Sequence, residues 1–117
     1  MKILILEDDG SRVNTFIEKF YIHDLTIIEN SYDAIDLLGQ TVFDHIFLDC
    51  DLGDRNGSGL DVSAFLQSHP SNLNNQANII IHSWNAPATK NMLKDIPSAS
   101  WIPFNTESFF EIDLLQP

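Results

Sequence analysis

"HIFLDCDLGDRNGSG", residues 45–59, begins as a largely apolar run and ends as a glycine-rich loop, with Asp49 and Asp51 at the junction. A short apolar run bounded by turn residues is typical of a strand that is covered on both faces. Carboxylates at the end of a buried strand are costly unless their charges are compensated. The stretch therefore predicts a central strand and a specific role for the acids that follow it.

Comparable apolar runs lie on both sides of this stretch, at residues 3–6, 25–28 and 78–81, with a weaker one at 100–103. The segments between them carry apolar residues at helical spacing, as in Val13, Phe16, Ile17 and Phe20. Ser31, Ser58 with Asp61, and Asn105 or Thr106 are expected to cap helices, and Pro87 fits a first helical turn. Strands that alternate with helices predict one α/β domain over residues 1–117, with a parallel sheet covered on both faces.

The composition limits the classes of function. The chain has 117 residues and a formal net charge of −11, from 17 acids and 6 bases. Such a charge disfavours binding to nucleic acid in general, and sequence-specific DNA binding is not expected. The apolar runs are too short to span a bilayer, so no membrane contact is expected. Cys50 is the only cysteine, so no internal disulfide can form, which fits a cytoplasmic protein.

Polar side chains follow three of the expected strands. Ligand sites in open parallel sheets lie beyond the carboxyl ends of the strands. The residues expected at this edge are Glu7, Asp8, Asp9, Asp49, Asp51, His82 and Ser83. Like charges held close together favour a bound cation, and oxygen ligands suit Mg²⁺ or Mn²⁺ rather than zinc. The alternative is that these acids cap the following helices or face solvent.

Four motifs resemble the receiver domain of bacterial response regulators over nearly the whole chain. They are ILILEDD (3–9), FLDCDLG (47–53), IIIHS (79–83) and WIPF (101–104). The resemblance implies a flavodoxin-like three-layer sandwich with five parallel strands in the order 2-1-3-4-5. It also implies that Asp8, Asp49 and the main-chain carbonyl of Asp51 bind Mg²⁺, with Glu7 completing the acidic pair. Asp49 would then accept a phosphoryl group, and Ser83 would hydrogen-bond its oxygens.

A narrower resemblance covers LDCDLG (48–53), SGLDV (58–62) and HSWNAPATKNM (82–92). These segments are similar to the cyclic-phosphate-processing receiver, a variant inferred to act on cyclic phosphate ends of RNA or of a nucleotide, here from a bacterial or phage source. The resemblance implies Asp49, His82 and Ser83 as catalytic candidates. It implies Ser83, Asn85 and Arg12 as phosphate-binding candidates, and Arg55 is a second candidate for an anion clamp.

Three positions depart from these families. Ile102 stands where receivers have the lysine that bridges the phosphoryl group, and Ala99 stands where they have a switch aromatic residue. Cys50 stands where the narrower signature has histidine, and its two flanking acids predict a raised thiol pKa. We also expect Ile102–Pro103 to be cis, as is common after the lysine position of receivers.

The neighbours at the end of the fourth strand raise a geometric question. Side chains of adjacent strand residues point to opposite faces, so His82 should turn away from a site that Ser83 faces. His82 is the natural acid–base candidate, and the alternative is a structural histidine with one hydrogen bond. Trp84 is expected at the rim of the site, where it either stacks on a ring of the ligand or packs against the protein.

The sequence favours an Mg²⁺-dependent domain that binds and processes a phosphate-containing small molecule or nucleic-acid terminus. It leaves open whether the domain is an enzyme, and a metal-dependent cyclic phosphodiesterase is the activity that the residues favour. One alternative is a single-domain phospho-accepting response regulator with a kinase partner. Another is a degenerate receiver that only binds a protein. If the domain processes a phosphate-containing ligand, an RNA-repair enzyme is the expected partner.

Overall fold

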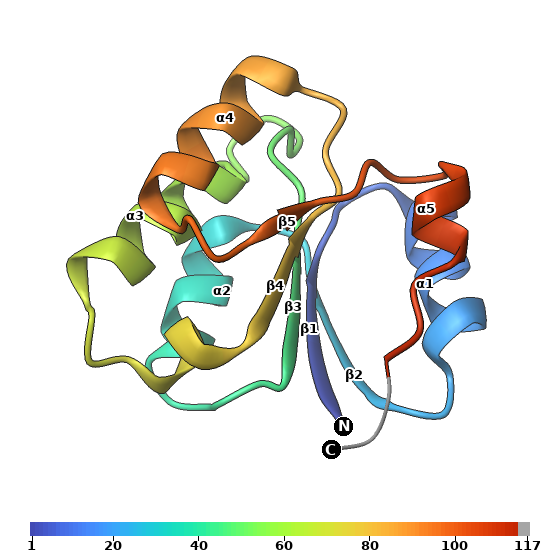
Figure 1. The fold of residues 1–117 in the computed structure, drawn as a ribbon, viewed down its shortest axis with the longest axis horizontal. Coiled ribbons are helices and arrows are strands. Elements are labelled where there is room, and N and C mark those ends of the chain that lie inside the picture. Colours follow the sequence, from blue (N-terminus) through green and yellow to red (C-terminus); the bar gives the residue numbers. More distant parts are fainter. Residues whose placement is uncertain (115–117) are drawn as a thin grey trace.

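The central layer is one five-stranded parallel sheet with the strand order β2-β1-β3-β4-β5 (Figure 1). The structure is a computed structural model, and it describes residues 1–114. The strands are β1 (Lys2–Leu6), β2 (Asp24–Ile28), β3 (His45–Leu48), β4 (Asn78–Ile81) and β5 (Ser100–Trp101). The parallel pairing and the order 2-1-3-4-5 confirm the predicted flavodoxin-like sandwich.

Helices cover both faces of the sheet (Figure 1). They are α1 (Gly10–Phe20), α2 (Ser31–Leu38), α3 (Gly59–Ser68), α4 (Ala86–Asp95) and the short α5 (Glu107–Phe110), with a 3₁₀ turn at Leu73–Gln76. Helices α2, α3 and α4 lie on one face, and α1 and α5 lie on the other. Within the described residues, no helix is both long and apolar enough to cross a membrane.

Alternation along the strands divides the core in two. Leu4, Leu6, Ile46, Leu48 and Ile81 pack in the cluster under α2, α3 and α4. Their neighbours on the strands point the other way, where aromatic residues of α1 and α5 meet them. In that second cluster the Phe16 ring lies 5.2 Å from Phe47 and 5.4 Å from Phe109, centroid to centroid.

The helix starts follow the expected capping chemistry with one correction. Ser58 and Asp61 form a capping box at α3, Thr106 caps α5, and Pro87 lies in the first turn of α4. Ser31 does not cap α2, because the Asn30 side chain accepts from the main-chain N–H of Asp33 and takes that position. Ser31 is instead the first helical residue, and its Oγ donates to Asp61 Oδ2 at 2.8 Å.

Strand β5 ends at Trp101, two residues before the expected end. Pro103 has no N–H to extend the ladder, although the segment stays beside β4 through Ile102 N to Ile81 O and Phe104 N to His82 O, both at 2.9 Å. No peptide bond among the described residues is cis. The expected cis bond at Ile102–Pro103 is therefore wrong, and the bond has the trans form that most X-Pro bonds favour.

Candidate functional site

A cavity of about 200 Å³ lies at the carboxyl edge of the sheet, where β1, β3 and β4 end. Its lining residues are Glu7, Asp8, Asp9, Arg12, Asp49, Asp51, Ser83 and Trp84. The structure thus brings the four predicted metal ligands together with two of the three predicted phosphate-binding residues. The other predicted residues, His82 and Asn85, do not line the cavity, and neither does Arg55.

Glu7 forms the buried floor of this cavity. It follows β1, is 1% exposed, and its Oε2 accepts from the main-chain N–H groups of Asp8 at 3.1 Å and Asp9 at 3.2 Å. Its Oε1 lies 3.0 Å from Nε2 of His82. Burial alone would raise the pKa of Glu7, but the hydrogen bond and charge of His82, then the main chain and Arg12, lower it. Glu7 is therefore a carboxylate at neutral pH.

Asp49 follows β3 and is 4% exposed. Its Oδ1 accepts from the main-chain N–H of Cys50 at 2.8 Å. Burial raises the pKa of Asp49 to about 7, and the neighbouring charge of Glu7 adds to the rise. Two buried carboxylates this close cannot both be ionised without cost unless a positive charge is near them.

Arg12 supplies part of that positive charge. Its Nη1 lies 3.8 Å from Glu7 Oε1 and 3.9 Å from Asp49 Oδ2, and its side chain is 32% exposed. The guanidinium is also 5.1 Å from the centroid of the Phe104 ring. Arg12 therefore faces the acids from α1 with a cation that is still partly open to solvent. Such a group can bind an oxyanion in the cavity.

Asp8, Asp51 and Asn85 form the more open part of the site. The main-chain N–H of Gly53 donates to Oδ2 of Asp8. The side-chain amide of Asn85 donates to Asp51 Oδ1 at 3.1 Å. Asn85 also caps α4 by accepting from the main-chain N–H of Ala88. Both ends of the Asn85 amide are therefore engaged, so a phosphate ligand would have to displace its bond to Asp51.

His82 lies one layer below the cavity. It is 0% exposed and packs edge-on against Phe16, with ring centroids 5.0 Å apart, whereas Ser83 faces the cavity. Burial lowers the pKa of His82, and this effect outweighs the hydrogen bond and charge of Glu7, which raise it. The imidazole is therefore neutral, and its Nε2–H donates to the Glu7 carboxylate. Its Nδ1 has no hydrogen-bond partner among the described residues. The alternation of side chains along a strand predicts that His82 and Ser83 point to opposite faces. It gives no signal for the contact between His82 and Glu7, which lies 75 residues away.

Cys50 points away from the cavity. It is 2% exposed and lies in the cluster under α3 and α4, with Sγ 3.0 Å from Met92 Sδ. The pKa of the Cys50 thiol is raised, as predicted, but burial is the largest cause and the flanking acids contribute less. Cys50, which stands where the narrower signature has histidine, is thus part of the core.

The cavity fits a hard divalent cation. Five carboxylates line it, and donor atoms of the buried residues Glu7, Asp49 and His82 all lie within 4.8 Å of one another. Because His82 is turned toward Glu7, the donors that reach the cavity are oxygens. Oxygen donors suit Mg²⁺ or Mn²⁺, whereas structural zinc sites use several Cys or His ligands.

The raised pKa of Asp49 predicts a pH effect in the metal-free protein. Its folded pKa, about 7, lies above its ordinary value of 3.8. Between these values the folded state keeps a proton that the unfolded state has lost, so this residue's contribution to stability falls as pH rises from about 4 to 7. In the presence of a chelator, Asp49→Asn should therefore melt higher than the wild type at pH 8 and show a smaller difference at pH 5. An equal difference at the two pH values would contradict this.

Comparisons with known proteins agree with the fold. The model of a family described as the cyclic-phosphate processing receiver domain matches residues 2–98. No curated protein of similar sequence was found. Among solved structures, the phosphorylated cyanobacterial phytochrome response regulator RcpA has 20% identity and a TM-score of 0.75, covering 94% of this chain and 86% of its own.

Two further structures carry a metal. The receiver domain of the sensor histidine kinase PA1611 from Pseudomonas aeruginosa PAO1 has a magnesium ion in its active site cleft, with 17% identity, a TM-score of 0.74, and coverage of 91% of this chain and 86% of its own. The Mn²⁺-bound response regulator Rcp1 has 18% identity and a TM-score of 0.73, and the match covers 94% of this chain and 86% of Rcp1. At these identities the likeness shows the fold.

Proposed function

Since this chain belongs to the family of cyclic-phosphate processing receiver domains, we propose that its acidic cavity binds Mg²⁺ or Mn²⁺ together with a phosphate-containing ligand and processes that ligand. The proposed ligand is a cyclic phosphate end of RNA or of a nucleotide, and the processing is its hydrolysis. A water oxygen bonds to phosphorus, one P–O bond of the ring breaks, and the freed ribose oxygen takes up a proton in exchange for the one that the water loses. One observation carries the proposal: a single cavity holds carboxylates for a cation, and a guanidinium and a hydroxyl for an anion.

The chain's own groups divide into two sets. Asp8, Asp49 and Asp51 are the proposed ligands of the cation, with Glu7 behind them. When bound, a divalent cation stabilises negative charge that develops on phosphoryl oxygens. Arg12 and Ser83 face the same cavity and are the proposed anion-binding groups. Such fixed donors stabilise a transition state most when they are already in place before the reaction.

Proton transfer is assigned to the Glu7–His82 pair. His82 reaches the cavity only through Glu7, because it is buried and its Nε2 is 3.0 Å from Glu7 Oε1. The neutral imidazole holds the carboxylate in one orientation, in the way that a second group orients an acid–base residue in many active sites. We therefore propose that His82 contributes to the reaction through Glu7.

Hydrolysis of a nucleoside 2′,3′-cyclic monophosphate in the presence of Mg²⁺ tests this function. Asp49→Asn should abolish turnover, because the cation loses a central ligand. His82→Phe keeps an aromatic ring among Phe16 and Phe47 but lacks the nitrogen that binds Glu7, so turnover should fall. Asp36→Asn removes one exposed charge on α2 and should leave turnover unchanged. Binding without turnover by the wild type would overturn the processing and leave a ligand-binding domain.

A phospho-accepting response regulator is the second candidate function. The buried Asp49 at the end of β3, beside a cavity that suits a divalent cation, favours it. Ile102 weighs against it, because this residue stands at the lysine position and packs against the aromatic core instead of lining the cavity. A kinase would be the partner in that case, and a receiver that only binds another protein is the remaining alternative.

We expect Asp49 to resist phosphorylation by small phosphodonors. The transferring phosphoryl group would lack the lysine that neutralises its charge, and Ile102 offers no donor in its place. Incubation with acetyl phosphate and Mg²⁺, followed by intact-mass measurement, should show no rapid phosphoryl adduct. A rapid and nearly complete adduct that disappears in Asp49→Asn would contradict the prediction and favour the response regulator.

A further inference from the structure

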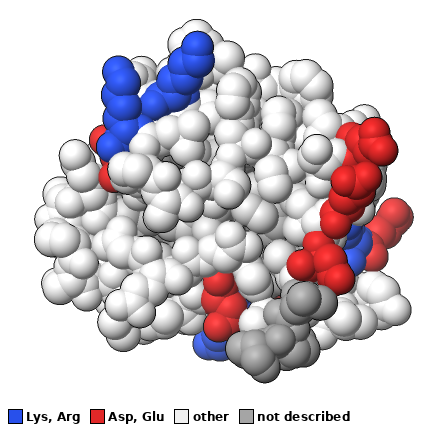
Figure 2. All heavy atoms as spheres, viewed as in Figure 1, with Lys and Arg blue, Asp and Glu red and all other residues white. Residues whose placement is uncertain are grey.

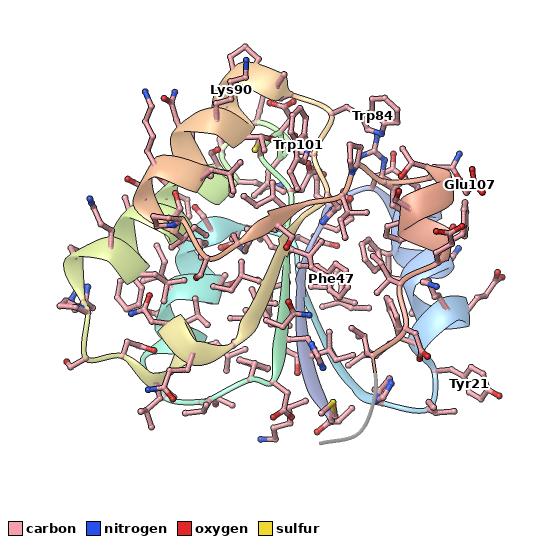
Figure 3. All side chains as sticks on the ribbon, viewed as in Figure 1. Tyr21, Phe47, Trp84, Lys90, Trp101 and Glu107 are labelled. Atoms are coloured by element: carbon pink, nitrogen blue, oxygen red, sulfur yellow. The ribbon has the colours of Figure 1, made fainter. Side chains whose placement is uncertain are left out.

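Trp84 lines the acidic cavity, yet binding of a cation and a phosphate gives it no role. It stands between Ser83 and Asn85 in the loop that joins β4 to α4. Ser83 is fully buried, whereas Trp84 is 61% exposed. Figure 3 shows the Trp84 side chain projecting outward from this loop at the top of the sheet. A large aromatic ring exposed at the rim of a polar cavity has unused apolar surface.

The Trp84 ring is held in place by the protein. Its Nε1 donates to the main-chain carbonyl of Phe104 at 2.8 Å, across to the loop between β5 and α5. The only polar atom of the ring is therefore satisfied, and what remains exposed is its apolar surface. A ring that is already fixed loses little conformational entropy when a ligand stacks on it.

Trp101 provides a comparison within the same chain. Its Nε1 also donates to a main-chain carbonyl, that of Ser83, at 2.8 Å. However, Trp101 does not line the cavity, and it is less exposed, at 37%. Figure 3 labels it on β5. The two tryptophans share their tethering, but only Trp84 presents its ring at the cavity.

We infer that Trp84 forms a stacking subsite for a flat aromatic base attached to the phosphate, so that the ligand is of the nucleotide class. This rests on the proposed function, since Arg12 and Ser83 must hold the phosphate beside the ring. The ring and the anion-binding groups line one cavity of about 200 Å³, so a phosphate held by Arg12 and Ser83 would lie in the cavity that the ring borders. Stacking on a fixed ring depends on the flat face that every base has, so it recognises the class rather than one base.

The charge of the surface limits this recognition to a local contact. The chain carries a formal net charge of −11. Figure 2 shows acidic side chains gathered on the side of α5, and two basic side chains projecting over the region of α4, which contains Lys90 and Lys94. A long polyanion would be repelled by much of this surface. A terminal nucleotide needs only the cavity and its rim.

Calorimetric titration in the presence of Mg²⁺ tests the subsite with two probes. One is a nucleoside 2′,3′-cyclic monophosphate, and the other is glycerol 1,2-cyclic phosphate, which lacks a base. Trp84→Ala should weaken binding of the cyclic nucleotide by about tenfold, as expected when a base loses its stacking on one aromatic ring. It should leave the glycerol probe unchanged. Trp84→Phe should restore most of the affinity for the nucleotide.

Fluorescence gives a second readout. The chain has two tryptophans, so Trp101→Phe leaves Trp84 as the only indole. Its emission should be quenched by the cyclic nucleotide but not by the glycerol probe. The Mg²⁺-dependent melting shift of Trp101→Phe should match that of the wild type, which shows that the variant folds with its site intact.

The outcomes separate the two proposals. If Trp84→Ala binds both probes as the wild type does, the stacking subsite is wrong and the proposed function stands. If Trp84→Ala weakens both probes equally, Trp84 only holds the loop, and the stacking inference is again wrong. If neither probe binds while Mg²⁺ still stabilises the protein, phosphate binding fails, and the stacking subsite fails with it.

Discussion

Saturating Mg²⁺ is expected to raise the melting temperature of the wild type by roughly 11 °C, and Asp49→Asn is expected to lose this gain. The cation removes the repulsion between Glu7 and Asp49, which lie together in the buried part of the cavity. Binding to the folded state alone stabilises it by about 2.7 kcal/mol at a hundredfold excess over the dissociation constant. Each kcal/mol is worth roughly 4 °C for a domain of this size.

Melting curves with Mg²⁺ and with a chelator measure this effect directly. Asp36→Asn is the matched control, because it removes one carboxylate that is exposed on α2, away from the cavity. Its response to Mg²⁺ should equal that of the wild type. If Mg²⁺ moves the melting temperature of the wild type no further than that of Asp49→Asn, the acidic cavity binds no cation and the site assignment fails.

Gly59→Ala is expected to lower the free energy of unfolding by about 3 kcal/mol, or roughly 12 °C in melting temperature. Gly59 is the first residue of α3 and is buried. A Cβ at this position would stand 2.0 Å from the main-chain oxygen of Asp49 and 3.0 Å from Met92 Cε. The main chain must shift to admit it. Alanine has the higher helix propensity, so a loss of stability would show that contact outweighs propensity here.

Gly10→Ala is the matched control for this prediction. Gly10 is the first residue of α1, as Gly59 is of α3, but a Cβ there would have no atom within 4 Å. Gly10→Ala should therefore be neutral, or more stable by up to about 1 kcal/mol, because alanine reduces the freedom of the unfolded chain. Thermal melting of the two variants compares them. Equal effects would contradict the close approach of α3 to Asp49.

Gly59 also connects the fold to the site. The residue lies against the carbonyl of Asp49, the central acid of the cavity. A shift of α3 would therefore move Asp49 as well, and Gly59→Ala should weaken the response to Mg²⁺ in addition to lowering stability. Gly10→Ala should keep that response. The close approach of the Asp49 carbonyl thus explains why glycine stands at position 59, at the end of the glycine-rich loop after β3.

Several features of the fold could be predicted from the sequence, because they depend on local patterns. Runs such as residues 3–6 and 79–81 are apolar without alternation, as expected for strands with both faces covered. The helical spacing around Phe16 and the capping pair of Ser58 and Asp61 mark helices through contacts within a few residues. Strictly alternating elements then bring the carboxyl ends of the strands to one edge.

The structure corrects two expectations, one drawn from a capping pattern and one drawn from the resemblance to receivers. Ser31 was expected to cap α2, but Asn30 is one residue earlier and reaches the Asp33 N–H. The Ile102–Pro103 bond was expected to be cis, but it is trans. In each case the residue type was compatible with both outcomes.

The sequence by itself determined the strand and helix pattern and the convergence of Glu7, Asp8, Asp49 and Asp51 on one edge, because periodicity and connection rules act locally. Only the tertiary structure decided how these groups act on one another. It placed His82 beneath Glu7, and it turned Cys50 into the core. These contacts join the ends of β1 and β4, and the end of β3 with α4, which are distant in the chain. Burial and the pKa of a carboxyl depend on every segment packed around it, so no local pattern could state them.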